Sequence, residues 1–551
     1  MNKYPLNSIE RLTDFRELLM RGAGKFGNKA AFRERTQGGV REISYADFAE
    51  NVRALAAALH ARLAGGRISI LGENSYAWVL SYFAVVTGGH TAVPLDKELS
   101  EEEMADELSR AKVDMLLYSP TYEEEARAAS DASGRQLQLL AMDWKGELPA
   151  LLEEGRSLLA MDSALWDGFS RPPEEVVSIL FTSGTTGRSK AVMLSQNNLM
   201  ANTKAACELV LFTPQDVLLS VLPLHHAYED MCGLFGPLYH GATICFCPWI
   251  KDLPRCMELF SPTVMVLVPL FIERFLGKIW AAARERGLEG KLRAGIRLAG
   301  ILDRLGIHVR HKLLAQPRAA LGGRLSIVIS GGAHLAAEHV KAMRELGVTV
   351  LQGYGVSECS PIVSAGRNHS VKDEACGWIA PCCEVKISQA GEILVRGENV
   401  MVGYLDDPKA TQAAIRQGWL HTGDLGWVDE DGFLYVTGRI KDMIVLKNGK
   451  NILPGELEEK ISALPLVGEC VVTAAEDGAS LLAAIYPDVE ASAGMEPDGI
   501  LRALEEGVQK LCESEVYYKK IAEVRLFARP FPRTTSGKTK RFEVEEELSR
   551  G

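Results

Sequence analysis

The chain consists of short apolar runs separated by segments in which apolar residues recur every three or four positions. Short apolar runs predict buried strands, and the three-four period predicts amphipathic helices. The predicted strands cover residues 67–71, 91–95, 113–118, 176–181, 218–224, 325–330 and 348–351, with helices at 76–86 and from about residue 197. A strand, a helix and a second strand in this order predict a parallel sheet with helices on its faces.

Two helices are predicted before the first of these strands. The first carries the stripe Leu12, Phe15, Leu18 and Leu19. The second is expected to begin after Ser44, because serine is a favourable N-cap residue, and its apolar face contains Phe48, Val52, Leu55 and Leu59.

The pattern changes near residue 390. A β-rich stretch is predicted from residue 391, with turns at 406–408 and 431–432. After residue 440, strands are predicted at 443–446, 470–473 and 481–486, with a helix from 456. This change indicates a second, smaller domain of mixed α and β structure.

The apolar run 176–181 leads directly into a loop of hydroxyl side chains and glycines. The loop reads Thr182-Ser183-Gly184-Thr185-Thr186-Gly187-Arg188-Ser189-Lys190. Glycines let several backbone N–H groups turn toward one point, while hydroxyls and a lysine add further donors, so the loop predicts a nest for a polyphosphate. A flexible Ser/Thr/Gly linker is the alternative, but such linkers do not usually follow a buried strand so abruptly.

Composition narrows the class of protein. A length of 551 residues predicts two or more domains, and 47% hydrophobic with 24% charged residues is ordinary for a water-soluble protein. The net charge of −11 argues against general nucleic-acid binding. We expect no signal peptide and no membrane-spanning segment, and the eleven cysteines lack zinc-ligand spacing and suit a reducing cytoplasm.

The segment Phe181–Lys190 resembles the phosphate-binding loop of the adenylate-forming (AMP-forming) acyl-CoA synthetase superfamily. One position departs from the family pattern, since Ser189 stands where the family usually has proline. The resemblance implies an α/β fold with a large N-terminal domain, residues 1–439, of parallel and mixed sheets, flanking helices and a β-rich subdomain. A small mobile α+β lid, residues 440–551, would follow.

Further motifs continue the resemblance in family order. In Gln352-Gly353-Tyr354-Gly355-Val356-Ser357-Glu358, it implies that Tyr354 stacks on adenine, Ser357 contacts the α-phosphate and Glu358 holds Mg²⁺. The small residues Gly331, Gly332 and Ala333 follow a predicted strand and allow a flat ring to lie against the backbone. The other residues implied to bind ATP or AMP are Thr182, Ser183, Gly184, Thr185, Thr186, Gly187, Lys190, Gly353, Gly355, Asp424, Val436 and Arg439.

The resemblance also assigns residues near the domain boundary and in the lid. Asp424 would bind the ribose hydroxyls and Arg439 the ribose and phosphate; alone, Thr422-Gly423-Asp424 is only a common turn. Lys441 matches the hinge, and Gly449 with Lys450 would line the coenzyme A tunnel. Lys538, in Thr534-Thr535-Ser536-Gly537-Lys538, matches the catalytic lysine, with a frayed basic C-terminus as the alternative.

Two adjacent histidines, His225 and His226, follow Pro223-Leu224. By themselves they suggest metal binding or surface polarity. In the family, the histidine two residues after Pro-Leu lies beside the carboxylate pocket, so the resemblance places His226 there. It would shape the acyl site and move as the site closes, without acting as a general base.

Residues 271–324 are basic in an otherwise acidic protein, with twelve Lys/Arg against four Asp/Glu. They also contain an apolar stripe that includes Ile272, Leu276 and Ile279. A core-packed helical pair with a solvated basic face is one interpretation, and a membrane-facing patch is the other. A helical insertion here resembles the long-chain fatty acyl branch of the family.

The resemblance therefore implies a ligase that uses ATP, Mg²⁺ and coenzyme A (CoA) to convert a carboxylic acid, of medium or long chain, to acyl-AMP and then acyl-CoA. A ligase that loads a separate carrier protein is the alternative for the acceptor. A non-catalytic nucleotide sensor is disfavoured by the presence of Glu358 and Lys538, and a luciferase-like oxidation is not distinguished by the motifs. The expected location is cytoplasmic, with weak peripheral membrane contact if the basic stretch faces a membrane.

Overall fold

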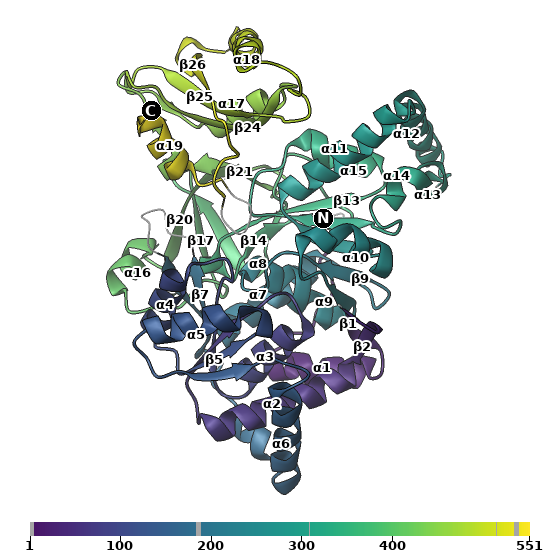
Figure 1. Cartoon of the computed structure of the whole chain (residues 1–551), viewed down its shortest axis with the longest axis vertical. Coiled ribbons are helices and arrows are strands. Elements are labelled where there is room, and N and C mark those ends of the chain that lie inside the picture. The colour runs from purple at the N-terminus through teal and green to yellow at the C-terminus, as the bar shows by residue number, and fades with distance from the viewer. Residues whose placement is uncertain (1–4, 183–188, 308, 514, 534–538, 551) are drawn as a thin grey trace. The chain divides into compact units, whose positions relative to one another are not determined.

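A computed structural model describes residues 5–182, 189–307, 309–513, 515–533 and 539–550 (Figure 1). The chain divides into two compact units. Unit 1 comprises Met1–Val385, Val395–Leu420 and Asp431–Phe433, and unit 2 comprises Lys386–Leu394, His421–Glu430 and Leu434–Gly551. The domain boundary between residues 439 and 440 remains a prediction.

The first sheet of unit 1 has nine strands among the described residues, in the order β15-β14-β13-β12-β11-β9-β10-β1-β2. From β13 to β1 neighbouring strands are parallel. The parallel pairing predicted from the strands at 67–71 and 91–95 occurs in the second sheet, where β3 pairs with β4. The strands are β1 (Ala30–Thr36), β2 (Gly39–Ser44), β9 (Val217–Ser220), β10 (Thr243–Phe246), β11 (Val264–Leu267), β12 (Ile327–Ser330), β13 (Thr349–Gly355), β14 (Ile362–Ala365) and β15 (Trp378–Ile379).

The second sheet of unit 1 has seven strands in the described part of the chain, in the order β18-β8-β7-β4-β3-β5-β6. Its centre is parallel, and β7 and β8 form an antiparallel hairpin at one side. The strands are β3 (Arg67–Leu71), β4 (Thr91–Pro94), β5 (Met115–Tyr118), β6 (Gln138–Ala141), β7 (Val176–Thr182), β8 (Lys190–Ser195) and β18 (Gly403–Tyr404).

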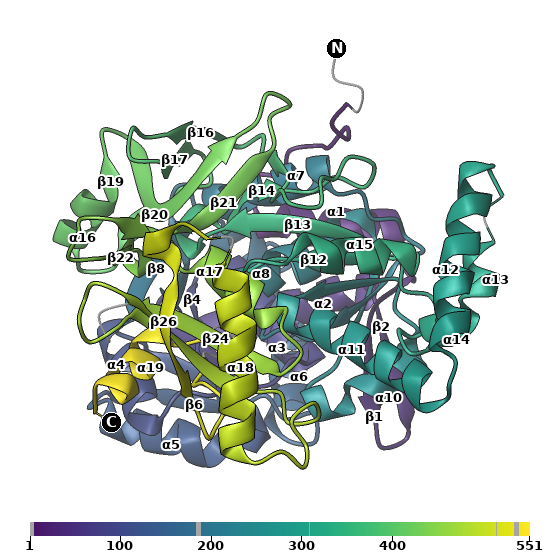
Figure 2. The same cartoon turned by 90° about the horizontal axis from the view of Figure 1, so that it is seen from above.

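Helices cover these two sheets (Figure 2). Apolar residues of the strands and of the covering helices form the buried cores of unit 1. The α-helices of unit 1 are α1 (Phe15–Phe26), α2 (Tyr45–Arg62), α3 (Tyr76–Thr87), α4 (Glu101–Arg110), α5 (Glu123–Ala132), α6 (Glu147–Met161), α7 (Gln196–Leu209), α8 (Ala227–Glu229), α9 (Gly236–His240), α10 (Leu253–Phe260), α11 (Pro269–Glu285), α12 (Glu289–Arg304), α13 (Arg310–Leu313), α14 (Ala315–Ala319), α15 (Ala337–Glu345) and α16 (Pro408–Ala414).

A five-stranded sheet has the order β16-β17-β20-β19, with β21 beside β20. Its strands are β16 (Cys383–Ile387), β17 (Glu392–Gly397), β19 (Ile415–Arg416), β20 (Trp419–Val428) and β21 (Leu434–Arg439). After β21 the chain contains β22 (Ile444–Val445), β23 (Asn451–Ile452), β24 (Val467–Ala474), β25 (Leu481–Pro487), β26 (Ile521–Leu526), α17 (Gly455–Ser462), α18 (Pro497–Cys512) and α19 (Arg541–Arg550). Helices α17 and α18 pack on β24 and β25 around one apolar core.

Local chemistry explains where several elements begin and end. Ser44 caps α2 as predicted, and its side chain and that of Asp47 form a reciprocal capping box. Leu12 is buried but precedes α1, whose N-cap is Asp14, so the predicted stripe begins one turn before the helix. The predicted strand 218–224 ends at Ser220, three residues before Pro223.

The acidic, alanine-rich segment 120–170 contains structure that the sequence did not indicate. It supplies η1 (Pro120–Tyr122), α5, β6, α6 and the 3₁₀ turn η2 (Leu165–Phe169). Helix α6 packs against α2 so closely that a Cβ on Gly155 would lie 1.7 Å from the carbonyl oxygen of Ala54. This glycine is therefore required by helix packing.

Candidate active site

The phosphate-binding loop predicted from the sequence begins and ends on the β7–β8 hairpin. Thr182 and Lys190 are aligned across the two strands, and the Thr182 hydroxyl donates to the Lys190 carbonyl over 3.4 Å. The predicted residues Ser183, Gly184, Thr185, Thr186 and Gly187, and the lysine Lys538, lie outside the described residues. Their roles stay predictions.

Glu358 and Lys190, which are far apart in sequence, both contact one tyrosine. The Tyr404 hydroxyl donates to Glu358 Oε1 over 2.8 Å. The Lys190 ammonium lies 4.8 Å from the centroid of the Tyr404 ring. Tyr404 is 7% exposed, and burial, followed by the charge of Glu358, raises its pKa. Tyr404 thus keeps its proton and orients one carboxylate oxygen of Glu358.

Sequence reasoning missed Tyr404. It lies on the two-residue strand β18, which pairs with β8 so that Tyr404 is opposite Val192. The Met401 N–H also donates to the Glu358 carbonyl over 2.8 Å, so the segment before β18 is joined to the Glu358 turn. No local pattern in the sequence reveals a pairing between residues more than 200 positions apart.

Tyr354 and its two flanking glycines lie on β13, and Ser357 begins the 3₁₀ turn η5 (Ser357–Cys359) that carries Glu358. A Cβ on Gly355 would lie 2.0 Å from the Pro361 carbonyl oxygen, and one on Gly353 would lie 3.2 Å from that of Ser364. Packing of β14 against β13 therefore demands small residues here, independently of any nucleotide.

The small residues Gly331, Gly332 and Ala333 follow β12, as the sequence analysis expected. The flat ring beside Gly331 in this structure is a side chain of the protein, since an added Cβ would lie 3.1 Å from the Tyr228 ring. The Tyr228 hydroxyl donates to the carbonyls of Ile329 over 3.0 Å and Leu267 over 3.3 Å. Tyr228 is thus fixed to two neighbouring strands.

His226 is the N-cap residue of α8, two residues before Tyr228. Burial, and then the neighbouring His225, lower the pKa of His226 to about 3. The two imidazole centroids are 4.4 Å apart, and His225 Nε2 lies 3.5 Å from Asp96 Oδ2. His226 is therefore neutral at physiological pH.

In unit 2, the predicted ribose-binding residues face one another across two strands. Asp424 on β20 is aligned with Arg439 on β21, and Arg439 Nε lies 2.9 Å from Asp424 Oδ1. Asp424 is only 3% exposed. Val436 is aligned with Gly426 on the same strand pair. The structure thus brings together three residues that the sequence placed in one group.

The residues predicted for the hinge and tunnel also belong to unit 2. Lys441 lies on the short turn η6 (Ile440–Asp442), where burial, and then Arg439, lower its pKa. Gly449 has a φ of +75°, which favours glycine, and nothing lies within 4 Å of where its Cβ would be. The Lys450 ammonium lies 5.3 Å from the Tyr518 ring centroid.

No group of three or more His, Cys, Asp or Glu residues suited to a metal ion occurs among the described residues. A protein cage for a metal is thus not built into the described part of the chain. Glu358 with its fixed carboxylate is a fitting donor for Mg²⁺, which usually binds through one or two carboxylates, water and substrate phosphates.

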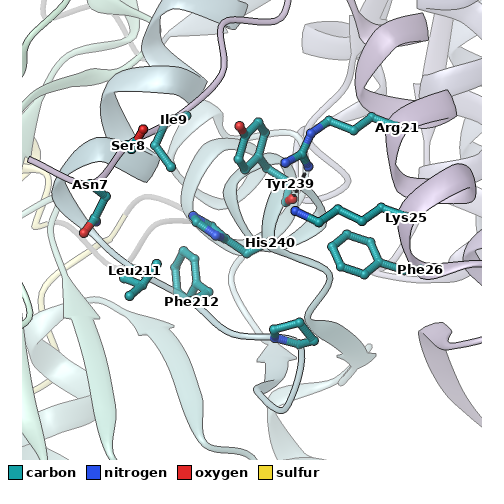
Figure 3. Close-up of a pocket in the computed structure, with 11 residues that line it drawn as sticks. Asn7, Ser8, Ile9, Arg21, Lys25, Phe26, Leu211, Phe212, Tyr239 and His240 are labelled. Atoms are coloured by element: carbon teal, nitrogen blue, oxygen red, sulfur yellow. Dashed lines mark hydrogen bonds between the residues drawn. The ribbon is translucent and has the colours of Figure 1, made fainter.

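A pocket in unit 1 lies apart from all the residues predicted for the site (Figure 3). Arg21 donates to the Tyr239 carbonyl over 2.6 Å, and its guanidinium lies 3.9 Å from the Tyr239 ring centroid. Its lining residues are Asn7, Ser8, Ile9, Arg21, Lys25, Phe26, Leu211, Phe212, Pro214, Tyr239 and His240. Arg21 thus already has a partner within the protein, Tyr239. The pocket lies where the N-terminal segment packs against α1 and α9.

Comparisons with known proteins identify the family of the chain. A model of AMP-binding enzymes matches residues 19–405, and a model of the AMP-binding enzyme C-terminal domain matches residues 441–550. A long-chain-fatty-acid–CoA ligase of Mycobacterium bovis is 32% identical over 453 residues, covering 78% of this chain and 75% of that protein.

Two further similarities span almost the whole chain. A 3-[(3aS,4S,7aS)-7a-methyl-1,5-dioxo-octahydro-1H-inden-4-yl]propanoyl:CoA ligase of Rhodococcus jostii is 28% identical and covers 98% of this chain and 99% of that protein. The solved structure of ATP-bound MatB from Rhodopseudomonas palustris aligns with a TM-score of 0.75 at 25% identity, covering 97% of this chain and 99% of that one. The adenylate-forming enzyme fold expected from the sequence is thereby confirmed. The chain belongs to the AMP-binding enzyme family and is an ATP-dependent, AMP-forming acid–CoA ligase that acts through an acyl-adenylate.

Proposed function

We propose that the acid activated by this ligase is a medium- or long-chain fatty acid. The observation that carries the proposal is the 32% identity to a long-chain-fatty-acid–CoA ligase over 78% of the chain. The Rhodococcus relative is named for a fused-ring acid. The names of both relatives therefore refer to a large apolar acid.

In the first half-reaction, the substrate carboxylate attacks the α-phosphorus of ATP, forming acyl-AMP and releasing pyrophosphate. A carboxylate is ionised at neutral pH and needs no general base. Cationic groups are needed to stabilise charge on the phosphoryl oxygens, and Lys190, Arg439 and Lys538 are the candidates. A neutral His226 beside the acid would leave the charge of the attacking carboxylate uncompensated.

Glu358 is the residue we propose to hold Mg²⁺, with the ATP phosphates as further ligands. Bound Mg²⁺ supplies charge neutralisation at the phosphates. Tyr404 fixes Glu358 Oε1, which leaves the other carboxylate oxygen available to a ligand. In the second half-reaction, the CoA thiol attacks the acyl carbonyl and AMP leaves, with Lys441 as the proposed hinge and Gly449 and Lys450 as the proposed tunnel residues.

The apolar stripe singled out from the sequence within residues 271–324 belongs to the core. On α11, Ile272, Leu276 and Ile279 are buried, with Phe271 and Phe275 packed against the same cluster. This stripe is therefore a packing surface. No helix in the described ranges is both long enough and apolar enough to cross a membrane.

A different apolar stripe lies on the outer face of α12. Leu298 and Ile301 share one side of α12, and Leu305 directly follows the helix as its C-cap residue. The three side chains are 46%, 56% and 69% exposed. The opposite side packs inward through Leu292 and Ile296. Figures 1 and 2 both show α12 and α13 at an edge of unit 1.

Charge around this stripe favours an anionic lipid surface as its partner. Residues 291–313 contain six Lys/Arg and one Asp within a protein of net charge −11. Arg297, Arg304 and Lys312 are exposed, as are the nearby Ile307 and Leu313. An exposed apolar stripe flanked by cations suits the interface of an anionic bilayer. We therefore propose weak peripheral membrane contact through α12 and α13.

The substrate proposal predicts a chain-length profile. Each methylene buried in the acyl site contributes about 0.8 kcal/mol, so kcat/KM should rise by up to about fourfold per methylene from acetate upward. Pyrophosphate release should be measured for saturated acids and for a fused-ring propanoate, with acyl-CoA identified by mass spectrometry. A preference for the fused-ring acid would overturn the fatty-acid proposal.

Replacement of the proposed catalytic lysine should separate the half-reactions. Lys538→Ala should slow adenylation by about a hundredfold or more, the scale for loss of one well-placed electrostatic donor. CoA transfer from preformed acyl-AMP should change far less. Lys540→Ala, which removes a nearby lysine paired with Glu543, is the matched control. Equal losses in both half-reactions would contradict the assignment.

Tyr404→Phe should weaken Mg²⁺-dependent adenylation while preserving the ring beside Lys190. Loss of one hydrogen bond to a carboxylate predicts about a tenfold fall in kcat/KM, with a higher Mg²⁺ requirement. The matched control is Tyr435→Phe, which removes the hydrogen bond from the Tyr435 hydroxyl to the Asp429 carboxylate. This variant should leave the Mg²⁺ requirement unchanged. An unaltered Mg²⁺ titration of Tyr404→Phe would refute the role.

The membrane proposal predicts binding to vesicles of anionic phospholipid that weakens with salt, because the attraction is screened within a Debye length of about 10 Å at 0.1 M. Combined serine replacement of Leu298, Ile301 and Leu305 should reduce co-sedimentation, and so should glutamate replacement of Arg297, Arg304 and Lys312. Met161→Ser and Arg127→Glu, at exposed positions of other helices, are the matched controls. Salt-independent binding, or self-association through this face in analytical ultracentrifugation, would contradict the proposal.

A further inference from the structure

Asn74 lies in the loop that follows β3, and its side chain contacts the loop that follows β9. Its Nδ2 donates to the Leu222 carbonyl over 2.6 Å and to the Ser220 hydroxyl over 3.0 Å. Its Oδ1 accepts from the Leu224 N–H over 3.2 Å. Strand β3 belongs to the seven-stranded sheet and β9 to the nine-stranded sheet. One side chain thus joins the loops at the carboxyl ends of two strands, one from each sheet.

The loop after β9 is buried beyond the end of its strand. Strand β9 ends at Ser220, and Leu222 and Leu224 are only 6% and 3% exposed. Buried main-chain N–H and C=O groups are costly unless they are hydrogen-bonded, and Asn74 supplies a partner for one of each. A side-chain amide offers donors and an acceptor together, whereas a carboxylate has no donor. The contacts therefore explain why an amide stands at position 74.

The same hydrogen bonds continue to the far side of His226. The Ser220 hydroxyl, which accepts from Asn74, donates to Glu229 Oε1 over 2.6 Å. The main-chain N–H of Glu229 donates to the His226 carbonyl over 3.0 Å. His226 therefore lies between two fixed points. Leu224, two residues before it, is bonded to Asn74 directly, and Glu229, three residues after it, is bonded to Asn74 through Ser220.

A second contact joins the same two sheets beside His226. Asp96 follows β4, the neighbour of β3, and its Oδ2 lies 3.5 Å from His225 Nε2. The segment 221–226 is thus held by groups from the seven-stranded sheet at two places. We propose that Asn74 is a positioning residue for the acid: it fixes the segment 221–226 and through it the place of the His226 imidazole.

This inference rests on the proposed place of His226 beside the acid. A segment that is fixed in advance loses less conformational freedom on binding, so its restraint should appear in the kinetics of the acid. The residues proposed to bind ATP lie on other elements, so the affinity for MgATP should be independent of Asn74. A general loss of folding stability would lack this selectivity.

The test is a double-mutant cycle on Asn74 and His226. Pyrophosphate exchange is measured with whichever acid gives the highest kcat/KM, so the result does not depend on the identity of the substrate. Asn74→Ala should lower kcat/KM for the acid about tenfold, because it leaves buried main-chain groups unpaired. In the His226→Ala background the same replacement should lower it by less than about threefold, since residues of one network are coupled. The Kd for MgATP, measured by calorimetry without acid, should change by less than about twofold.

Further variants keep the test decisive. Asn74→Asp preserves the shape of the side chain but removes both donors, so it should lose as much as Asn74→Ala. Ser220→Ala breaks the second link of the same hydrogen bonds and should show the same selectivity for the acid, should Asn74→Ala fail to fold. Asn368→Ala is the matched control, because Asn368 also donates to and accepts from main chain, at Leu211. Thermal unfolding shows whether each variant is folded.

The outcomes separate this inference from the proposed place of His226. Normal acid kinetics in folded Asn74→Ala, with impaired His226→Ala, would overturn the role of Asn74 and leave the place of His226 standing. Equal losses from Asn74→Ala with and without His226, or a rise in the Kd for MgATP as large as the loss for the acid, would also overturn that role. Normal acid kinetics in His226→Ala would overturn the place of His226 itself.

Discussion

The antiparallel pairing of β7 with β8 is the interaction on which the unit 1 site depends. Strand β7 is buried beside the parallel strand β4, so its direction is fixed by the centre of the sheet. The hairpin returns as β8, and β8 in turn pairs with β18. Lys190 begins β8 and Tyr404 ends β18, which is why these two residues meet beside Glu358. A shift of one residue in either register would turn alternate side chains to the other face of the sheet.

In unit 2 the corresponding constraint is electrostatic. Asp424 is almost completely buried, and a buried carboxylate is costly unless it is paired and hydrogen-bonded. Arg439, aligned with it on the adjacent strand, provides the pairing charge, and its side chain remains 35% exposed. The β20–β21 register therefore does two things at once. It compensates the buried charge, and it leaves part of the Arg439 side chain exposed.

Much of this could be predicted from the sequence because the determining interactions are local. The strand Arg67–Leu71 and the cap at Ser44 follow from a continuous apolar run and from one hydroxyl before a helix. Contacts over long sequence separations were missed. The contact of Tyr404 with Glu358 requires the two-residue strand β18. The contact of Arg110 with Ser189 requires that α4 lies beside the β7–β8 hairpin. The apolar stripe of α11 was recognised from the sequence. The exposed apolar stripe of α12 could not be recognised, because the sequence does not tell which side of that helix packs inward.

Glycines in the predicted nucleotide-binding segments can be required by packing within the protein. Gly355 and Gly331 both lie in segments whose resemblance implies nucleotide binding. In the structure, β14 approaches Gly355 and the Tyr228 ring approaches Gly331, so both positions need a small residue for packing alone. Their presence therefore does not by itself distinguish an enzyme from a non-catalytic protein of the same fold. Glu358, oriented by Tyr404 beside Lys190, carries more weight because packing alone does not require a carboxylate there.

The environment of His226 gives the last physical argument about the chemistry. Burial lowers the pKa of His226 to about 3 and raises that of Glu229 to about 8, so both groups are neutral near pH 7. Glu229 Oε1 accepts from the Ser220 hydroxyl over 2.6 Å, which holds the side chain against β9. If the acid binds beside His226, as we propose, a charged imidazolium there would pair with the substrate carboxylate and weaken it as a nucleophile. A negative Glu229 would repel that carboxylate. Burial of both groups in their neutral forms therefore suits a ligase whose acid must be bound as an anion and remain reactive.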